Sequence, residues 1–176
     1  MSSTLEKVYI DTMVFLNQLF NKTHILHSNS ERFFHDIENQ KYIGVTSSFT
    51  RSEYLAIIKE ELACKLNTVP PQKDVDKALE IFDSFIEEMG IEYFDSDELV
   101  SFALNKDGKF FMNCYDHILS SRPIKGKDNK WRMLNGADSI VLLFAEACNA
   151  NRIATNDDGF KGTNSYIAPL VPREVY

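Results

Sequence analysis

The chain has 176 residues, 44% of them hydrophobic, with 7 Gly and 5 Pro and a formal net charge of −7. This length and composition exclude collagen-like, low-complexity and disordered chains, and they predict a single globular domain over residues 1–176. The acidic balance argues against a general coat for nucleic acid. It does not exclude a nuclease, because a site built from carboxylates is itself acidic and needs only a local basic patch to face phosphates.

The cysteines and the N-terminus bear on the cellular compartment. Cys64, Cys114 and Cys148 are widely spaced and include no Cys-x-x-Cys pair, so neither a disulfide framework nor a thiolate zinc site is expected. No uncharged apolar run approaches the ~20 residues of a membrane helix, and the first residues lack the basic start and apolar stretch of a signal peptide. These features predict a soluble, cytoplasmic protein that does not enter a membrane.

Strand-like and helix-like segments alternate along the chain. The predicted strands are residues 7–11, 42–46, 91–94 and 152–155, with a short edge strand within 166–171. The predicted helices are residues 13–20, 30–40, a segment after the second strand that carries Tyr54 to Leu62, and then 75–89, 96–104, 110–119 and 137–149, with a loop at about 121–135. This alternation predicts an α/β fold, a three-layer α/β/α sandwich with a central parallel sheet.

Four carboxylates stand where such a sheet would bring them together. Asp11 ends the first strand, and Glu53 opens the helix after the second strand. Asp138 opens the apolar helix 137–149, and Asp157 follows the strand that comes next. In open α/β sheets, ligands bind beyond the carboxyl ends of the strands. Converging carboxylates repel one another unless a hard cation neutralises them, and oxygen ligands alone indicate Mg²⁺ or Mn²⁺ rather than zinc.

Each acid also has a purely structural interpretation. Asp11 fits an N-cap, Thr50 to Glu53 fits a capping box, and Asp138 lies where a helix dipole favours an anion. The run from Asn156 to Gly159 has the composition of a tight turn, so Asp157 or Asp158 could serve the turn alone. Four separate capping events need not fall at one end of one sheet, so their joint placement favours a functional site.

The motifs around these acids resemble those of PIN-domain ribonucleases. The resemblance spans nearly the whole chain, and its last motif, a strand followed by Thr-x-Asp with Phe three residues after the Asp, is the most specific. The matching segments are Val8-Tyr9-Ile10-Asp11-Thr12, Val45-Thr46-Ser47-Ser48 leading to Glu53-Tyr54-Leu55, Gly136-Ala137-Asp138-Ser139-Ile140, and Ile153-Ala154-Thr155-Asn156-Asp157-Asp158-Gly159-Phe160.

The resemblance implies a metal-dependent endoribonuclease that hydrolyses RNA phosphodiester bonds with Mg²⁺ or Mn²⁺. Carried over to this chain, the catalytic and metal-binding residues are Asp11, Glu53, Asp138 and Asp157, supported by Thr155, Thr12 and Asp158. Similar single-domain proteins are VapC-type toxins, so an antitoxin protein and a homodimer are expected partners, with RNA processing as the alternative role.

Two departures from the family pattern support a different interpretation. Met13 stands where many members have a small polar residue, and the connection at about 105–135 is longer than usual. A catalytically weak PIN-like scaffold that binds RNA or a protein is therefore the alternative to the ribonuclease.

A basic cluster lies within this long connection. Lysines, arginines and the single tryptophan are the residue types that contact phosphates and stack on bases, which predicts RNA binding near the site, while the simpler interpretation is a solvated loop. The cluster comprises Arg122, Lys125, Lys127, Lys130, Trp131 and Arg132, interrupted by Asp128.

Overall fold

The computed structural model describes residues 5–22, 24–95, 97, 101, 116–125, 128–163, 165 and 167–175. Its central feature is a five-stranded sheet with the strand order β3-β2-β1-β6-β7, in which every neighbouring pair is parallel. The strands are β1 (Glu6–Ile10), β2 (Tyr42–Ser47), β3 (Glu92–Phe94), β6 (Arg152–Ala154) and β7 (Ala168–Leu170). The predicted parallel sheet is thus confirmed, including its edge strand near the C-terminus.

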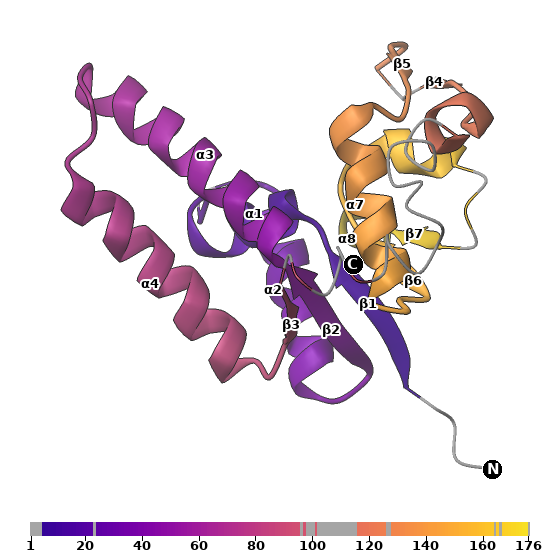
Figure 1. The fold of residues 1–176 in the computed structure, drawn as a ribbon, viewed down its shortest axis with the longest axis horizontal. Coiled ribbons are helices and arrows are strands. Elements are labelled where there is room, and N and C mark those ends of the chain that lie inside the picture. The colour runs from indigo at the N-terminus through magenta and orange to yellow at the C-terminus, as the bar shows by residue number, and fades with distance from the viewer. Residues whose placement is uncertain are drawn as a thin grey trace.

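Helices cover both faces of this sheet, as Figure 1 shows. The helices are α1 (Thr12–Leu19), α2 (His27–Glu38), α3 (Ser48–Leu66), α4 (Gln72–Glu88), α7 (Gly136–Ala147), α8 (Pro172–Val175) and the 3-10 helix η1 (Asp158–Gly162). The first four pack on one face, and α7 packs on the other. This arrangement confirms the three-layer α/β/α sandwich.

Alternation along β1 explains why both faces are covered. Val8 and Ile10 are buried in a cluster with α1, α2, α3 and α4, whereas Tyr9 between them is buried in a second cluster with α7. A strand in the middle of a parallel sheet must be apolar on both sides, because helices remove both faces from water. The sequence Val-Tyr-Ile meets this requirement.

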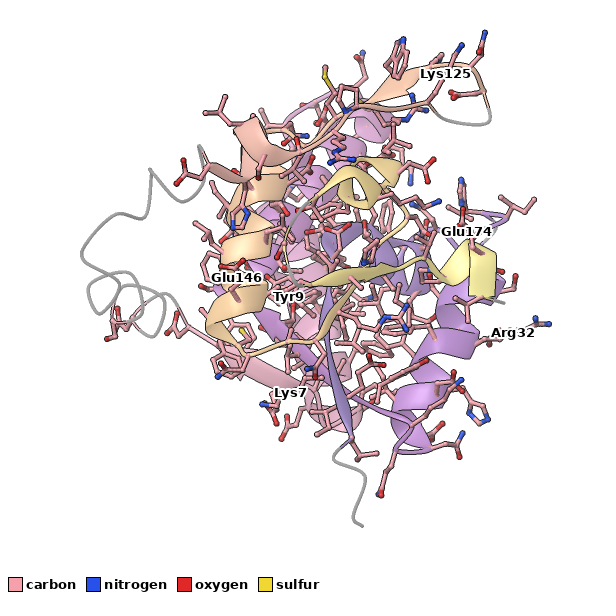
Figure 2. The ribbon with its side chains drawn as sticks, turned by 90° about the vertical axis from the view of Figure 1, so that its right-hand side faces the viewer. Lys7, Tyr9, Arg32, Lys125, Glu146 and Glu174 are labelled. Atoms are coloured by element: carbon pink, nitrogen blue, oxygen red, sulfur yellow. The ribbon has the colours of Figure 1, made fainter. Side chains whose placement is uncertain are left out.

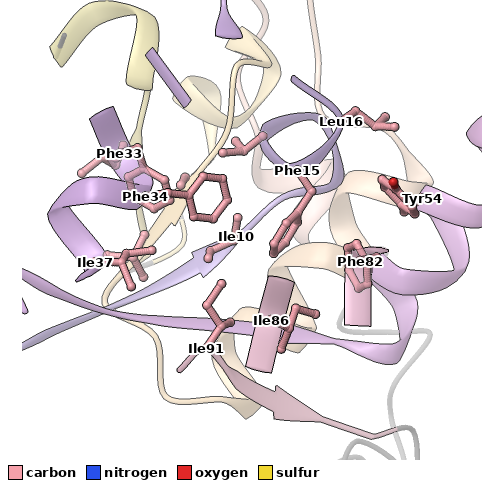
Figure 3. Packing of buried hydrophobic residues seen from close by; sticks show 14 of the residues in the cluster. Ile10, Phe15, Leu16, Phe33, Phe34, Ile37, Tyr54, Phe82, Ile86 and Ile91 are labelled. Atoms are coloured by element: carbon pink, nitrogen blue, oxygen red, sulfur yellow. The ribbon is translucent and has the colours of Figure 1, made fainter. Parts of the chain in front are cut away.

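Aromatic rings fill the first cluster. The ring of Phe15 lies 5.5 Å from that of Phe34 and 4.9 Å from that of Phe82, and the ring of Tyr54 lies 4.7 Å from that of Phe82. Figure 3 shows these side chains beside Ile10 of β1. Buried aromatic pairs of this kind stabilise a fold beyond the area they bury. This cluster therefore holds α1, immediately after Asp11, firmly against the sheet.

The segment between β3 and α7 differs from the predicted loop. Residues 121–135 contain a two-stranded antiparallel hairpin, β4 (Ile124–Lys125) and β5 (Trp131–Arg132), with Lys125 opposite Trp131. The predicted helices 96–104 and 110–119 fall mostly outside the described residues, although residues 116–120 are helical. Over the described part of the chain, no helix is long and apolar enough to cross a bilayer.

Candidate functional site

Strand register brings the first and last predicted motifs side by side. Ile10 of β1 pairs with Ala154 of β6, and the backbone N–H of Asp11 donates to the Ala154 carbonyl at 3.0 Å. Asp11 and Thr155 therefore leave adjacent parallel strands at the same edge of the sheet. This carboxyl edge is the place where open α/β sheets bind ligands.

Asp11 is buried and fully hydrogen-bonded. It is only 8% exposed, its Oδ1 accepts from the Thr12 backbone N–H at 2.8 Å, and its Oδ2 accepts from the Thr155 hydroxyl at 2.7 Å. Asp11 is thus the N-cap of α1, as its structural interpretation predicted. The bond from Thr155 ties the end of β1 to the end of β6 and fits the expected supporting role of that hydroxyl.

Glu53 reaches the same edge from α3, but not through the predicted capping box, which is wrong. The helix begins at Ser48, so Thr50 is already inside its first turn, with its hydroxyl 2.9 Å from the buried Tyr9 hydroxyl. Glu53 Oε2 instead accepts from the Thr12 hydroxyl at 2.7 Å. This contact joins α3 to α1 and turns the Glu53 carboxylate toward Asp11.

A capping box does occur at Asp138. Asn135 is the N-cap of α7, its Oδ1 accepts from the Asp138 backbone N–H, and Asp138 Oδ2 accepts from the Asn135 backbone N–H at 2.9 Å. This helix begins at Gly136, one residue before the predicted range 137–149. Asp138 has a capping function through one oxygen, and its second oxygen accepts no hydrogen bond among the described residues.

The choice between Asp157 and Asp158 is resolved by their contacts. Asp157 Oδ1 caps η1 by accepting from the Gly159 N–H at 2.7 Å, and the Asp157 N–H donates to the Thr155 hydroxyl at 3.0 Å. Asp158 points elsewhere and forms an ion pair of 2.9 Å with Lys161. Asp157 is therefore taken as the fourth acid of the site, because its charge acts on Asp138, whereas Asp158 pairs with Lys161.

Asp11, Glu53, Asp138 and Asp157 are hereafter called the acidic quartet, and three of them, Asp11, Glu53 and Asp138, have raised pKa values. Burial raises the pKa of Asp11 to about 7, and the nearby charges of Glu53 and Asp138 add to this effect. Burial also raises the pKa of Glu53, and it raises that of Asp138, where the charges of Asp157 and Glu53 contribute. Burial is thus the main cause of each raised pKa, and smaller charge effects link Asp11 with Glu53 and Asp138, and Asp138 with Asp157 and Glu53.

No basic side chain among the described residues neutralises this charge. The ion pairs of the described residues involve other acids, and the nearest lysine in sequence, Lys161, pairs with Asp158 and Glu174. Within the same residues, no group of three or more His, Cys, Asp or Glu side chains is arranged to hold a metal ion. Each of the four carboxylates instead accepts a hydrogen bond from a backbone N–H or a threonine hydroxyl of the chain.

The quartet nevertheless has the donor chemistry that a hard cation requires. All its ligand atoms are carboxylate oxygens, which suit Mg²⁺ and Mn²⁺. Glu53, Asp138 and Asp157 each use one oxygen in hydrogen bonds, and the second accepts none among the described residues. Three carboxylate oxygens of the quartet are thus left without a hydrogen bond from the described residues.

The basic cluster lies next to this edge. The Arg122 backbone N–H donates to the Gly162 carbonyl at 2.7 Å, and β4 packs against η1, which directly follows Asp157. Lys125, Lys130 and Trp131 are exposed, whereas Arg132 forms an ion pair of 2.8 Å with Asp128. Lys127 lies outside the described residues.

Two residues make contacts in the site that the sequence pattern did not predict. The Thr12 hydroxyl was expected only as a general support, and its bond to Glu53 depends on how α1 and α3 pack. Asn135 was not predicted as part of the site, yet its backbone N–H donates to the Asp138 carboxylate while its side chain accepts from the Ala137 and Asp138 N–H groups. An Asn three residues before an Asp is the sequence signal that could have identified this box.

Comparisons with known proteins add no family to this description. No protein-family model matches the chain, and no curated protein matches it. The resemblance to PIN-domain ribonucleases thus stays a prediction that rests on the motifs and on the geometry above.

Proposed function

We propose that this protein is a divalent-metal-dependent endoribonuclease of the PIN type, with the acidic quartet as its metal and catalytic site. The observation that carries the proposal is the gathering of four carboxylates at the carboxyl edge of the sheet, where burial and the neighbouring acids raise the pKa values of Asp11 and Asp138 and no described Lys or Arg pairs with the four. Such repulsion costs stability, and a bound Mg²⁺ or Mn²⁺ would remove it.

Each side chain has a role in this proposal. Glu53, Asp138 and Asp157 would hold the cation through their second oxygens, with Asp11 beside them. Thr12 and Thr155 are positioning residues, because their hydroxyls donate to Glu53 and Asp11 and fix the direction of these carboxylates. When bound, the cation lowers the pKa of a water molecule and stabilises charge on the scissile phosphate.

We propose two alternative biological roles for this ribonuclease. As a VapC-type toxin, the protein would have an antitoxin protein as its partner and could act as a homodimer. As an RNA-processing enzyme, it would use the same quartet without an antitoxin. Growth arrest on expression, relieved by a co-expressed neighbouring gene, would identify the toxin.

The alternative function is a PIN-like scaffold without catalysis. It is favoured by the capped state of the quartet, which forms no metal-holding group among the described residues, and by the exposed Met13 side chain beside Asp11. A scaffold would bind RNA or a protein equally well with the quartet converted to amides.

Cleavage of RNA distinguishes the two functions. Labelled single-stranded and structured RNAs are incubated with wild type and Asp138→Asn in Mn²⁺, Mg²⁺ or EDTA. The amide keeps an oxygen for the Asn135 N–H, so the variant should fold. Cleavage that needs the cation and is lost in the variant supports the ribonuclease. Equal cleavage by both proteins, or none by wild type despite RNA binding, contradicts it.

A further inference from the structure

We propose that the β4–β5 hairpin is a binding arm for single-stranded RNA, in which one unpaired base stacks on Trp131 while Lys125 and Lys130 contact the adjoining phosphates. This inference rests on the proposed function and gives it a substrate class, namely RNA with unpaired bases beside the cleaved bond. The hairpin residues used here are Lys125, Lys130 and Trp131.

The register of the hairpin places the Trp131 ring and the Lys125 side chain on one face. Lys125 pairs with Trp131 across the two strands, and Ile124 pairs with Arg132. Side chains directly opposite in an antiparallel pair lie on the same face, so Lys125 and Trp131 share one face, while the other pair is half-buried on the opposite side. The Lys125 ammonium lies 5.9 Å from the centre of the Trp131 ring. A cation and an aromatic surface are therefore presented together.

The exposure of Trp131 is unusual for its type. The side chain is 64% exposed although tryptophan generally buries most of its surface in a folded domain. Figure 2 shows Lys125 at the outer end of the molecule, far from the buried Tyr9, so the arm reaches into solvent. Base stacking needs one accessible ring face and a nearby positive charge, and both are present.

The arm is fixed at both ends next to the acidic quartet. At its start, Arg122 is bound to Gly162, and a side chain at position 162 would collide with the Arg122 carbonyl. At its end, Leu134 is buried in the core under α7, and Asn135 caps that helix together with Asp138. The arm thus emerges between the segments that carry Asp157 and Asp138, so a strand bound to it is delivered to the carboxylates.

The surroundings of Trp131 favour RNA over a protein partner. Protein-binding hot spots centre on desolvated apolar patches, whereas the turn before Trp131 consists of exposed Asp128, Asn129 and Lys130, and only Met133 after it adds an exposed apolar side chain. The carboxylates repel phosphates, so a substrate needs cations close to the site in a chain whose net charge is −7. Bases in a duplex are stacked on one another and cannot cover the ring.

The single tryptophan makes the inference directly measurable, because all tryptophan fluorescence comes from Trp131. In EDTA, which prevents cleavage, the protein is titrated with a ten-nucleotide oligouridylate, an oligoadenylate and a blunt duplex of equal length. We expect quenching by both single strands and none by the duplex at the same concentrations. Quenching by the duplex as strong as that by the single strands would overturn the inference.

Variants separate stacking from charge. Measured by anisotropy of labelled oligouridylate, Trp131→Ala should weaken binding by about 5- to 150-fold, the range found for loss of one stacked base. The double change of Lys125 and Lys130 to Ala should make the slope of log affinity against log salt concentration shallower. The change should correspond to the release of roughly one to two fewer counterions. Tyr93→Ala, an exposed aromatic on β3, and the double change of Lys59 and Lys73 to Ala are the controls and should leave both quantities unchanged.

The outcomes distinguish failure of this inference from failure of the proposed ribonuclease. If single-stranded RNA binds Trp131→Ala as tightly as it binds wild type, and cleavage in Mn²⁺ is unchanged, the binding-arm inference is wrong. The proposed ribonuclease is unaffected by that result. In that case the hairpin would be a surface for a protein instead. Binding to Trp131 without any cleavage supports the arm and overturns the nuclease.

Discussion

The acidic quartet and the β4–β5 hairpin lie side by side, but they are built in opposite ways. The quartet is carried by the ends of regular strands and helices, and donors of the chain itself hold each carboxylate. The hairpin has strands of two residues each, its functional side chains are exposed, and only its two ends are anchored. The proposed catalytic carboxylates thus lie on regular strands and helices, whereas the side chains proposed to bind RNA lie on a short hairpin.

The largest expected effect is the loss of RNA cleavage when a carboxylate of the acidic quartet is replaced. Glu53→Gln keeps an oxygen for the Thr12 hydroxyl but removes a charge from the quartet. We expect cleavage in Mn²⁺ to fall by at least ~100-fold. Replacing a residue that only hydrogen-bonds to a metal ligand already lowers metal affinity by about 10- to 100-fold, and Glu53 is proposed as a ligand itself. Glu60→Gln, an exposed position on the same helix, is the matched control and should cleave as wild type does. A Glu53→Gln protein that cleaves normally would remove Glu53 from the site.

The second effect is on the pH dependence of stability without metal. Burial raises the pKa of Asp11 from 3.8 to about 7. Between these values the folded state binds more protons than the unfolded state, so the contribution of Asp11 to stability falls as pH rises from about 4 to about 7. Asp11→Asn cannot ionise and still offers an oxygen to cap α1.

Chemical denaturation in EDTA at several pH values measures this difference. The free energy of unfolding of wild type, taken relative to Asp11→Asn, should drop by up to about 4 kcal/mol across that range. Repeating the series in Mn²⁺ should shrink the drop, because the cation favours the charged carboxylate. A constant difference from pH 4 to pH 7 would show that Asp11 ionises normally.

The smallest of the expected effects concerns the anchor of the hairpin. Gly162→Ala places a methyl group against the Arg122 carbonyl, so the backbone must shift, and we expect a loss of about 1–3 kcal/mol in stability. Gly136→Ala is the matched control, because nothing lies within 4 Å of a side chain there, and it should be neutral or slightly stabilising. Equal stability of the two variants in thermal unfolding would show that the hairpin is not anchored at Gly162.

Much of the fold followed from local patterns in the sequence. The run Val8-Tyr9-Ile10 is apolar on both faces and could only be an inner strand, and Asp11 after it had to lie at the carboxyl edge. The buried character of α7 was equally plain from its nearly all-apolar sequence. These predictions succeed because the hydrophobic pattern of each segment shows, without any other part of the chain, which of its sides are buried.

The remaining details depend on contacts between distant segments. Thr50 fits a capping box by spacing, yet its hydroxyl lies against Tyr9, and the helix starts two residues earlier. Strands of two residues show no periodicity, so the hairpin could not be separated from a loop. Whether Asp157 or Asp158 faces the quartet was decided by Lys161, whose position depends on the fold of η1.

Titration of Mn²⁺ into the protein tests the central claim most directly. Calorimetry is carried out with wild type, Glu53→Gln and Glu60→Gln, all at a pH above 7, where the raised pKa of Asp11 no longer opposes ionisation. The account predicts saturable binding by wild type and by Glu60→Gln, with affinity for Glu53→Gln reduced at least ~10-fold. Absence of binding by folded wild type, or equal affinity in all three proteins, would contradict a metal site at the acidic quartet.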